Sequence, residues 1–330
     1  PDNQDLYIKS IPLVSKPEPI SYGEYAASHK DAAESNGLYV AEGEKYSAKS
    51  DAYIRSSAVK NAVLKPYSTY TKKINVLDGS TWSSVGQTVA WEINVKETGL
   101  YRLGMRYSLT GNAGKASYRS LKIDGALPFA ECASLAVTGS GNGYGNFVFS
   151  AENGTPYEFY LTKGTHLISM RVEMGALNNA YNEIKALMQE INEIGTMLQK
   201  LTAGTTDENR TWDMNEYMPG TVDSLKGFAK RARAIYAELK AMDKTGAAYA
   251  SNLVYAAESL EKLAAKPEQI PNRTNLLSIG DNSASKYLGV VLSGLTSHPI
   301  TVDRIYVFAG CELPAAKAGF LKSTAEGFKT

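Results

Sequence analysis

Two successive segments between Val89 and Tyr107 alternate apolar with polar residues, and this pattern constrains the fold more than any other feature of the chain. The apolar positions are Val89, Trp91, Ile93 and Val95, then Tyr101, Leu103, Met105 and Tyr107. A period of two is typical of a β-strand with one buried face. Residues 96–99 separate the segments, and Gly99 can supply the positive φ that a tight connection needs. We therefore predict a β-hairpin whose apolar face is covered by the other strands.

Further short strands are expected on both sides of this segment, with a short helix before them at residues 21–30. The expected strands lie within residues 37–59, 117–123, 146–150, 157–161 and 165–174. Asp124 and Gly125 form a dipeptide that favours a type I′ turn, and the glycine-rich residues 138–146 predict a loop. Short strands separated by turn signals favour an antiparallel sandwich over parallel βαβ units.

The hydrophobic period changes at Gly175, where apolar residues begin to recur at intervals of three and four. This spacing predicts helices over approximately residues 175–198, 215–242, 247–265 and 282–295. One face of each helix is apolar, and the connections are short enough for neighbouring helices to be antiparallel. We therefore predict a helical bundle.

Residues 299–309 again predict a strand, which an isolated helical bundle would leave unpaired. This strand is therefore assigned to the sandwich, and the bundle becomes an insertion. The predicted organisation is an extended lead-in at 1–20, a discontinuous sandwich at 21–174 and 298–312, an inserted antiparallel bundle at 175–297 and a linker helix at 313–330.

Composition and charge exclude several partners. The 35 lysine and arginine residues balance 34 aspartate and glutamate residues, so we expect no nucleic-acid ligand. No apolar run approaches the roughly 20 residues of a membrane span, so we expect no direct membrane insertion of this segment. Pro1 does not begin a signal peptide, which indicates a processed or trimmed amino terminus. Tyrosine is abundant (21, against 8 phenylalanines), which suits either a β-rich core or a wet, sugar-binding surface.

The reactive side chains do not form a recognisable catalytic or metal motif. Cys132 and Cys311 lack metal-ligand spacing; they either form a disulfide or are two isolated thiols. The three histidines are scattered, so no zinc site is expected. The chain has no nucleophile-elbow motif and no phosphate-binding glycine loop, and its acidic residues are dispersed rather than paired as in a glycosidase. We therefore expect no enzymatic activity.

Several motifs, in this order, resemble the amino-terminal region of large extracellular solute-binding lipoproteins of sugar ABC transporters from Gram-positive bacteria. They are WEINVKETGLYRLGMRY, LKIDGALPFAE, YEFYLTKGTHLI, EMGALNNAYNEIKALMQEINEI, KLAAKPEQIPNR and ITVDRIYVFAG. The resemblance implies a jelly-roll sandwich like a carbohydrate-binding module, with a helical insert, ahead of a bilobal sugar-binding domain. This chain ends where that domain would begin, and residues 138–146 lack the tryptophan that family members often carry.

The resemblance also implies a function: a non-catalytic accessory part of a cell-surface-anchored carbohydrate-uptake protein, with weak glycan contact or a spacer role. Its partners would be a polysaccharide or oligosaccharide and, through the full-length protein, an ABC permease. The alternative is a free-standing carbohydrate-binding or cell-surface protein-interaction module.

Two sets of residues are candidates for binding. Trp82, Tyr118 and Tyr144 are expected on loops, where aromatic faces can stack on pyranose rings, whereas Trp91 is expected in the core. In the resembled sandwiches a structural calcium joins an early glutamate to an aspartate on the last strand, and Glu42 and Asp303 are similar in position. The alternative for this pair is two surface acids at the sandwich edges.

Overall fold

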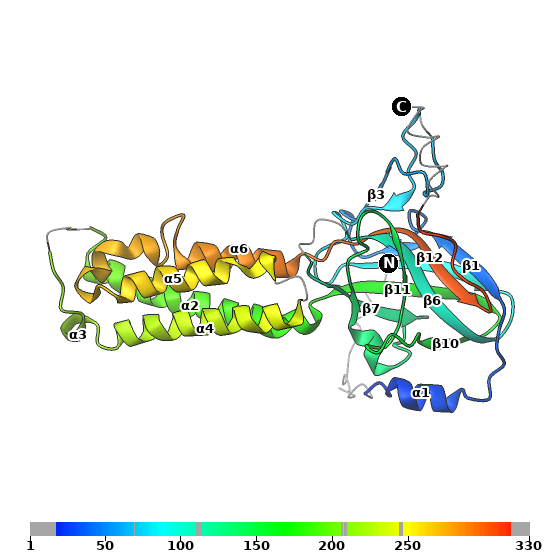
Figure 1. Ribbon diagram of the computed structural model, residues 1–330, viewed down its shortest axis with the longest axis horizontal. Coiled ribbons are helices and arrows are strands. Elements are labelled where there is room, and N and C mark those ends of the chain that lie inside the picture. Colours follow the sequence, from blue (N-terminus) through cyan, green and yellow to red (C-terminus); the bar gives the residue numbers. More distant parts are fainter. Residues whose placement is uncertain are drawn as a thin grey trace, which may run out of the picture.

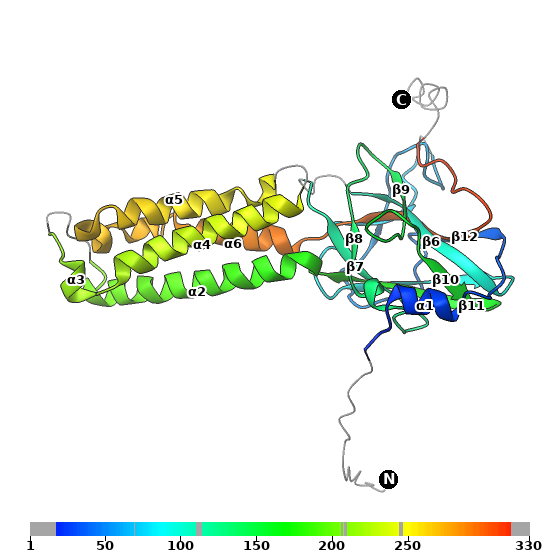
Figure 2. The same cartoon turned by 60° about the horizontal axis from the view of Figure 1, so that its bottom comes forward.

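The computed structural model describes residues 18–68, 70–109, 114–205, 207, 210–243 and 247–317. Figure 1 and Figure 2 show a β-sandwich from which a long bundle of helices projects at one end. The predicted fold class, a β-sandwich with an inserted helical bundle, is confirmed.

The sandwich consists of two antiparallel sheets. Within the described residues, the seven-stranded sheet contains β1 (Gly37–Glu42), β3 (Ser56–Ser57), β4 (Val76–Leu77), β6 (Gly99–Ser108), β9 (Gly145–Val148), β10 (Glu158–Leu161) and β12 (Thr301–Ala309). The five-stranded sheet, in the same part of the chain, has the order β2 (Ala48–Lys49), β5 (Thr88–Val95), β11 (Gly164–Glu173), β7 (Ser117–Ile123) and β8 (Leu135–Val137). Apolar side chains of both sheets meet in one core.

The prediction of a hairpin between β5 and β6 is wrong. β5 pairs with β2 and β11, whereas β6 pairs with β9, β10 and β12 in the other sheet, so residues 96–98 carry the chain across the sandwich. Alternation identifies which face of a strand is buried but not which strand it pairs with. The apolar faces of β5 and β6 point into the same core from opposite sheets. Gly99 is required by close approach rather than by φ, since an added Cβ would lie 2.1 Å from Ser35 Oγ.

β12 lies inside the seven-stranded sheet, between β6 and the pair β1 and β4. All the helices of the bundle precede it and follow β11 in the chain (Figure 1). The backbone groups that an isolated strand would leave unpaired are therefore hydrogen-bonded on both sides.

Four long helices form the bundle, and each packs against two others. They are α2 (Asn178–Leu201), α4 (Thr221–Met242), α5 (Asn252–Ala264) and α6 (Ala284–Thr296). The short helix α3 (Met214–Tyr217) precedes α4, and Pro219 with Gly220 separates the two. Among the described residues, four 3-10 segments complete the helical elements, at Ala130–Ala133 in the sandwich and at Gly175–Leu177, Ala248–Ala250 and Pro267–Leu276 in the bundle. The bundle has a hydrophobic core of its own.

The ends of the described chain agree only in part with prediction. α1 (Tyr22–Ser28) confirms the short helix before the sandwich, and its Tyr25 packs on Phe129. Residues 313–317 are irregular, while residues 318–330 of the predicted linker helix and 1–17 of the predicted lead-in lie outside the described residues. In the part of the chain that is described, no helix combines the length and apolar character needed to cross a membrane.

Candidate functional site

Lys115 attaches the bundle to the sandwich. Its Nζ donates to the backbone oxygen of Gly294 in the last turn of α6 at 2.6 Å and to that of Ser297, the residue that caps this helix. A cation at this end of a helix also meets the negative end of the helix dipole. Burial, with a smaller contribution from the charge of Arg119, lowers the pKa of Lys115 to about 8. The end of the inserted bundle is thus fixed by a desolvated lysine from the sandwich.

Arg119 of β7 makes a second buried attachment. Its Nη2 donates to the backbone oxygen of His298 at 2.7 Å and to that of Trp82 at 3.3 Å. The guanidinium lies 4.2 Å from the centre of the Trp82 ring, a cation–π contact. Because His298 lies between α6 and β12, Arg119 fixes the point where the chain returns to the sandwich.

A pocket of about 530 Å³ opens at this junction between sandwich and bundle. Its sandwich wall comes from β7 and the residues before it and from the glycine-rich loop 138–146, and its bundle wall comes from the start of α2, the end of α4 and the turn before α5. The lining residues are Gly114, Lys115, Ala116, Tyr118, Thr138, Gly139, Gly141, Leu177, Met242, Asp243 and Tyr249. The volume is that of a small-molecule site.

Tyr118 is placed in the pocket by the hinge at which the chain leaves the sandwich. Gly175 follows β11 with a φ of 55°, and a Cβ on it would lie 2.1 Å from Cδ1 of the Tyr118 ring. The absence of a side chain at Gly175 therefore lets the ring pack over the backbone between β11 and α2. The Tyr118 ring also meets His298 edge to face, with centroids 6.1 Å apart. Tyr118 is held by contacts from both ends of the insert.

Tyr249 and Asp243 form the polar part of the bundle wall. Burial raises the pKa of Tyr249 to about 12, with further contributions from the negative charge of Asp243 and from Tyr118. The hydroxyl of Tyr249 is therefore protonated at neutral pH and remains a hydrogen-bond donor and acceptor. Asp243 is 8% exposed, and its Oδ2 accepts a hydrogen bond from the backbone N–H of Ala247 at 3.2 Å. Two aromatic rings and a carboxylate thus surround one cavity.

Among the three predicted sugar-contacting residues, only Tyr118 lines this pocket. Trp82 is fully buried, donates from Nε1 to the backbone oxygen of Gln87 at 3.3 Å, and packs edge to face on Trp91 with centroids 6.0 Å apart. The premise that Trp82 stands on a loop with no core to fill is wrong. The core position predicted for Trp91 is confirmed.

Tyr144 is also buried, at 6% exposure, in a small cluster with Leu64 and Val76. Burial, with the charge of Asp303 as a smaller contribution, raises the pKa of Tyr144. Its ring face is covered, so a sugar could not stack on it without rearrangement of the loop. The structure therefore does not bring the three aromatic residues together into one platform.

Glu42 and Asp303 do come together, through an arginine. Arg304 donates to Oε1 of Glu42 at 3.1 Å, and its Nε lies 3.7 Å from Oδ2 of Asp303. Arg106 donates to the same Oδ2 at 2.5 Å. The prediction of two surface acids is wrong for Asp303, which is fully buried. The sequence reasoning missed both arginines, because β6 and β12 are distant in the chain.

The donor chemistry around this pair suits calcium in one respect. One carboxylate oxygen each of Glu42, Glu44 and Asp303 is buried without a hydrogen-bond partner among the described residues. Burial raises the pKa of Asp303 and of Glu44, which means that the charged form of each carboxylate is destabilised. Within the same residues, however, no group of three or more acidic, histidine or cysteine side chains has metal-binding spacing. Carboxylate oxygens are the type of ligand that calcium binds. The three carboxylates are not grouped closely enough for a metal site, and arginines bridge Glu42 and Asp303 instead.

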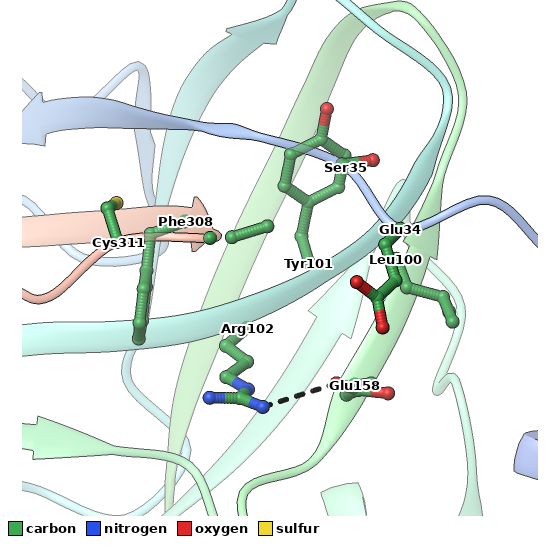
Figure 3. Close-up of a pocket in the computed structure, with 10 residues that line it drawn as sticks. Glu34, Ser35, Leu100, Tyr101, Arg102, Glu158, Phe308 and Cys311 are labelled. Atoms are coloured by element: carbon green, nitrogen blue, oxygen red, sulfur yellow. Dashed lines mark hydrogen bonds and ion pairs between the residues drawn. The ribbon is translucent and has the colours of Figure 1, made fainter.

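A second hollow, of about 260 Å³, lies where β6, β10 and β12 meet (Figure 3). Arg102 and Glu158 form an exposed ion pair of 3.5 Å at its rim, and Cys311 lies on the opposite side. Its two aromatic residues, Tyr101 and Phe308, are 1% and 5% exposed and offer little ring face to a ligand. Cys311 is exposed and Cys132 is buried, and both are free thiols.

The bundle residues of the junction pocket could not be found from sequence. Tyr249 and Asp243 lie more than a hundred positions after Tyr118, and no motif relates them. Two signals in the sequence lie near the pocket: Gly175, and the polar residues at the ends of two amphipathic helices. They show where the helices begin and end, but not which residues of the sandwich the helix ends contact.

Comparison with known proteins identifies the bundle. Residues 179–295 match the family model described as bacterial solute-binding protein, 4-helix bundle domain. Among curated proteins, none matches the sequence of this chain.

The sandwich is similar to solved carbohydrate-binding modules at low identity. A family 35 module from Clostridium thermocellum shares 14% identity over 42% of this chain and 87% of its own, with a TM-score of 0.30. The CBM35 of Abf62 from Cellvibrio japonicus shares 15% over 41% and 82%, with a TM-score of 0.24. The C-terminal CBM6 of LamC from Zobellia galactanivorans shares 12% over 41% and 89%, with a TM-score of 0.26.

Proposed function

We propose that this chain is a non-catalytic accessory part of an extracytoplasmic solute-binding protein that serves carbohydrate uptake by an ABC transporter, and that it makes weak glycan contact. The match of residues 179–295 to the bundle domain of bacterial solute-binding proteins carries this proposal. In the proposed setting the full-length protein is anchored at the cell surface as a lipoprotein and delivers sugar to an ABC permease.

The glycan contact is assigned to the junction pocket, through Tyr118. Its ring lies at the wall of a cavity large enough for one or two sugar rings, beside backbone groups of Gly139 and Gly141 that can exchange hydrogen bonds with hydroxyls. A pocket bordered by solvent repays only part of the cost of ordering a ligand. We expect dissociation constants between roughly micromolar and millimolar.

Titration calorimetry of the whole chain against glucose, galactose, mannose, xylose and their β-1,4-linked oligomers tests this assignment. Binding by one of these sugars should fall about tenfold or more in Tyr118→Ala, as expected for a central aromatic contact. Tyr53→Ala is the matched control, because Tyr53 is 58% exposed on the sandwich and lies outside the pocket. Nanomolar binding, or equal effects of the two variants, would contradict the assignment, and no binding at all would leave a spacer role.

A structural calcium at Glu42 and Asp303 is a separate proposal. The buried oxygen atoms of Glu42, Glu44 and Asp303 support it, and the positive charges of Arg106 and Arg304 oppose it. If calcium is bound, removal by a chelator should lower the melting temperature, and Asp303→Asn should abolish that difference. A melting temperature that is the same with chelator and with excess calcium would exclude the metal.

The alternative function is a free-standing carbohydrate-binding or cell-surface interaction module in which the bundle docks a protein. A shallow hollow of about 560 Å³ along α2, with Leu292 of α6 at its edge, favours it, because Met197 in this hollow is 53% exposed. Neighbouring genes separate the two functions: adjacent permease genes would favour transport, and an adjacent glycosidase or S-layer-type gene would favour the module.

A further inference from the structure

We infer that the helical insert completes the sugar site, so that the ligand of the junction pocket is a neutral sugar ring held between Tyr118 of the sandwich and Tyr249 and Asp243 of the bundle. This inference rests on the proposed glycan function. It assigns to the insert a direct binding role rather than that of a spacer.

The two walls of the pocket come from parts of the chain with separate hydrophobic cores. Tyr118 precedes the insert in sequence and belongs to β7, whereas Met242 ends α4 and Tyr249 lies in the turn Ala248–Ala250 before α5. The sandwich alone would present Tyr118 and a glycine-rich loop to solvent. With the bundle in place, the same ring lines a two-walled pocket of about 530 Å³ that remains partly open to solvent.

The geometry that brings the walls together is fixed by buried contacts. Lys115, itself a lining residue, holds the carbonyl end of α6, and the chain leaves the sandwich at Gly175 beneath the Tyr118 ring. A desolvated lysine bonded to carbonyls does not reorient without losing those bonds. The bundle wall is thus held in position before any ligand arrives, which lowers the cost of binding.

The chemistry of the lining selects a neutral polyol with an apolar face. The rings of Tyr118 and Tyr249 offer apolar surface, and the Tyr249 hydroxyl and Asp243 carboxylate offer a donor and acceptors for hydroxyl groups. The ammonium of Lys115 is already bonded to two backbone carbonyls. A sugar acid would therefore meet the negative charge of Asp243 and would have to compete with α6 for Lys115, so we expect it to bind more weakly than the neutral sugar.

The test is calorimetry of the full chain with the best-binding neutral sugar of the panel and with glucuronic and galacturonic acid, the uronic acids of two of its hexoses. Tyr249→Ala should weaken binding about tenfold or more, and Asp243→Asn about 10- to 100-fold, the scale for a lost hydrogen bond to a charged acceptor. Asn keeps an acceptor for the Ala247 N–H, so the local turn is preserved. Tyr255→Ala, on the exposed face of α5 at 49% exposure, is the matched control and should leave affinity unchanged.

The outcomes separate this inference from the proposed function. Loss of binding in Tyr118→Ala with wild-type affinity in Tyr249→Ala and Asp243→Asn would overturn the role of the insert and leave the sandwich site standing. Absence of binding by the wild-type chain would overturn both this inference and the glycan contact of the proposed function, and would leave the spacer role. Tighter binding of either uronic acid than of the neutral sugar would overturn the ligand class. Urea unfolding of each variant identifies any loss of affinity caused by misfolding.

Discussion

Replacing Arg106 by methionine should destabilise the sandwich strongly, because it leaves a buried carboxylate without its nearest cation. Arg106 lies on β6 and Asp303 on β12, on either side of the inserted bundle in sequence, and their side chains are 5% and 0% exposed. Removing one partner of such a buried pair costs about 3–5 kcal/mol. Arg304 Nε remains 3.7 Å from Asp303, so we expect a loss near about 3 kcal/mol, the lower end of that range.

The same strand provides a matched control. Arg102 lies four residues earlier on β6 and pairs with Glu158 at 3.5 Å, with side chains 49% and 44% exposed. Solvent screens this pair, so Arg102→Met should cost no more than about 1 kcal/mol. The double variant Arg106→Met, Asp303→Leu removes both buried charges and should recover much of the lost stability, since an apolar pair can replace a buried ion pair.

The cost of Arg106→Met should also depend on pH. Burial raises the pKa of Asp303, and Arg106 opposes that rise, so the variant raises it further. A carboxyl whose folded-state pKa exceeds its unfolded value of about 3.9 binds its proton more tightly in the folded state. Stability is therefore gained as pH falls from the folded-state pKa toward about 3.9, and this gain is larger in the variant. The difference in free energy of unfolding between Arg106→Met and the wild type should therefore become smaller as the pH is lowered.

Urea unfolding at neutral and acidic pH, in chelator and in calcium, measures both effects. In a Trp212→Phe background the only tryptophans are Trp82 and Trp91, both buried in the sandwich, so fluorescence reports the sandwich alone. The role of the Arg106–Asp303 pair would be refuted if Arg106→Met lowered the free energy of unfolding no more than Arg102→Met does. It would also be refuted if the difference in stability between Arg106→Met and the wild type did not change with pH.

Three other results are expected. Trp82→Ala should cost about 3–5 kcal/mol in urea unfolding because the ring is fully buried, and a selective loss of glycan binding without loss of stability would contradict this. Burial, with the charge of Lys115 next, lowers the pKa of His298 to about 3, so stability should fall as pH drops from about 6.5 toward 3. His298→Leu should flatten that dependence, and an unchanged pH profile would show that His298 is not its source. Cutting the chain near Lys266 should unpair β12 and destabilise the sandwich, and a 21–266 protein that melts as cooperatively as the intact chain would argue against a discontinuous domain.

The sequence predicted the fold class because each strand and helix carries its own period. The change at Gly175 from a period of two to one of three and four marked the start of the insert, and β12 was assigned to the sandwich because its backbone needs partners. A pairing of β5 with β6 was wrongly predicted, since two strands that bury the same core give the same pattern whether they belong to one sheet or to two.

The candidate site could be predicted only for Tyr118. Trp82 lies between β4 and β5, outside any strand, and its burial depends on Trp91 and on Arg119, whose positions no local pattern reveals. Tyr249 and Asp243 face the sandwich because of how the bundle is docked, which depends on contacts such as Lys115 to Gly294 between distant segments. The period and spacing of apolar residues describe one helix or strand at a time, whereas this site lies between the sandwich and the bundle.

Methyl NMR of the eight methionines, labelled selectively with ¹³C, tests most directly whether the sugar site lies at the junction of sandwich and bundle. Met242 lines the pocket and is 44% exposed, whereas Met197 is 53% exposed elsewhere on the bundle and Met105 is buried in the sandwich core. Met242→Leu assigns the decisive signal. Titration with the best-binding neutral sugar should shift the Met242 methyl and leave Met197 and Met105 unmoved. A sugar that binds without shifting Met242, or that shifts Met197 instead, would contradict a site shared by the two parts of the chain.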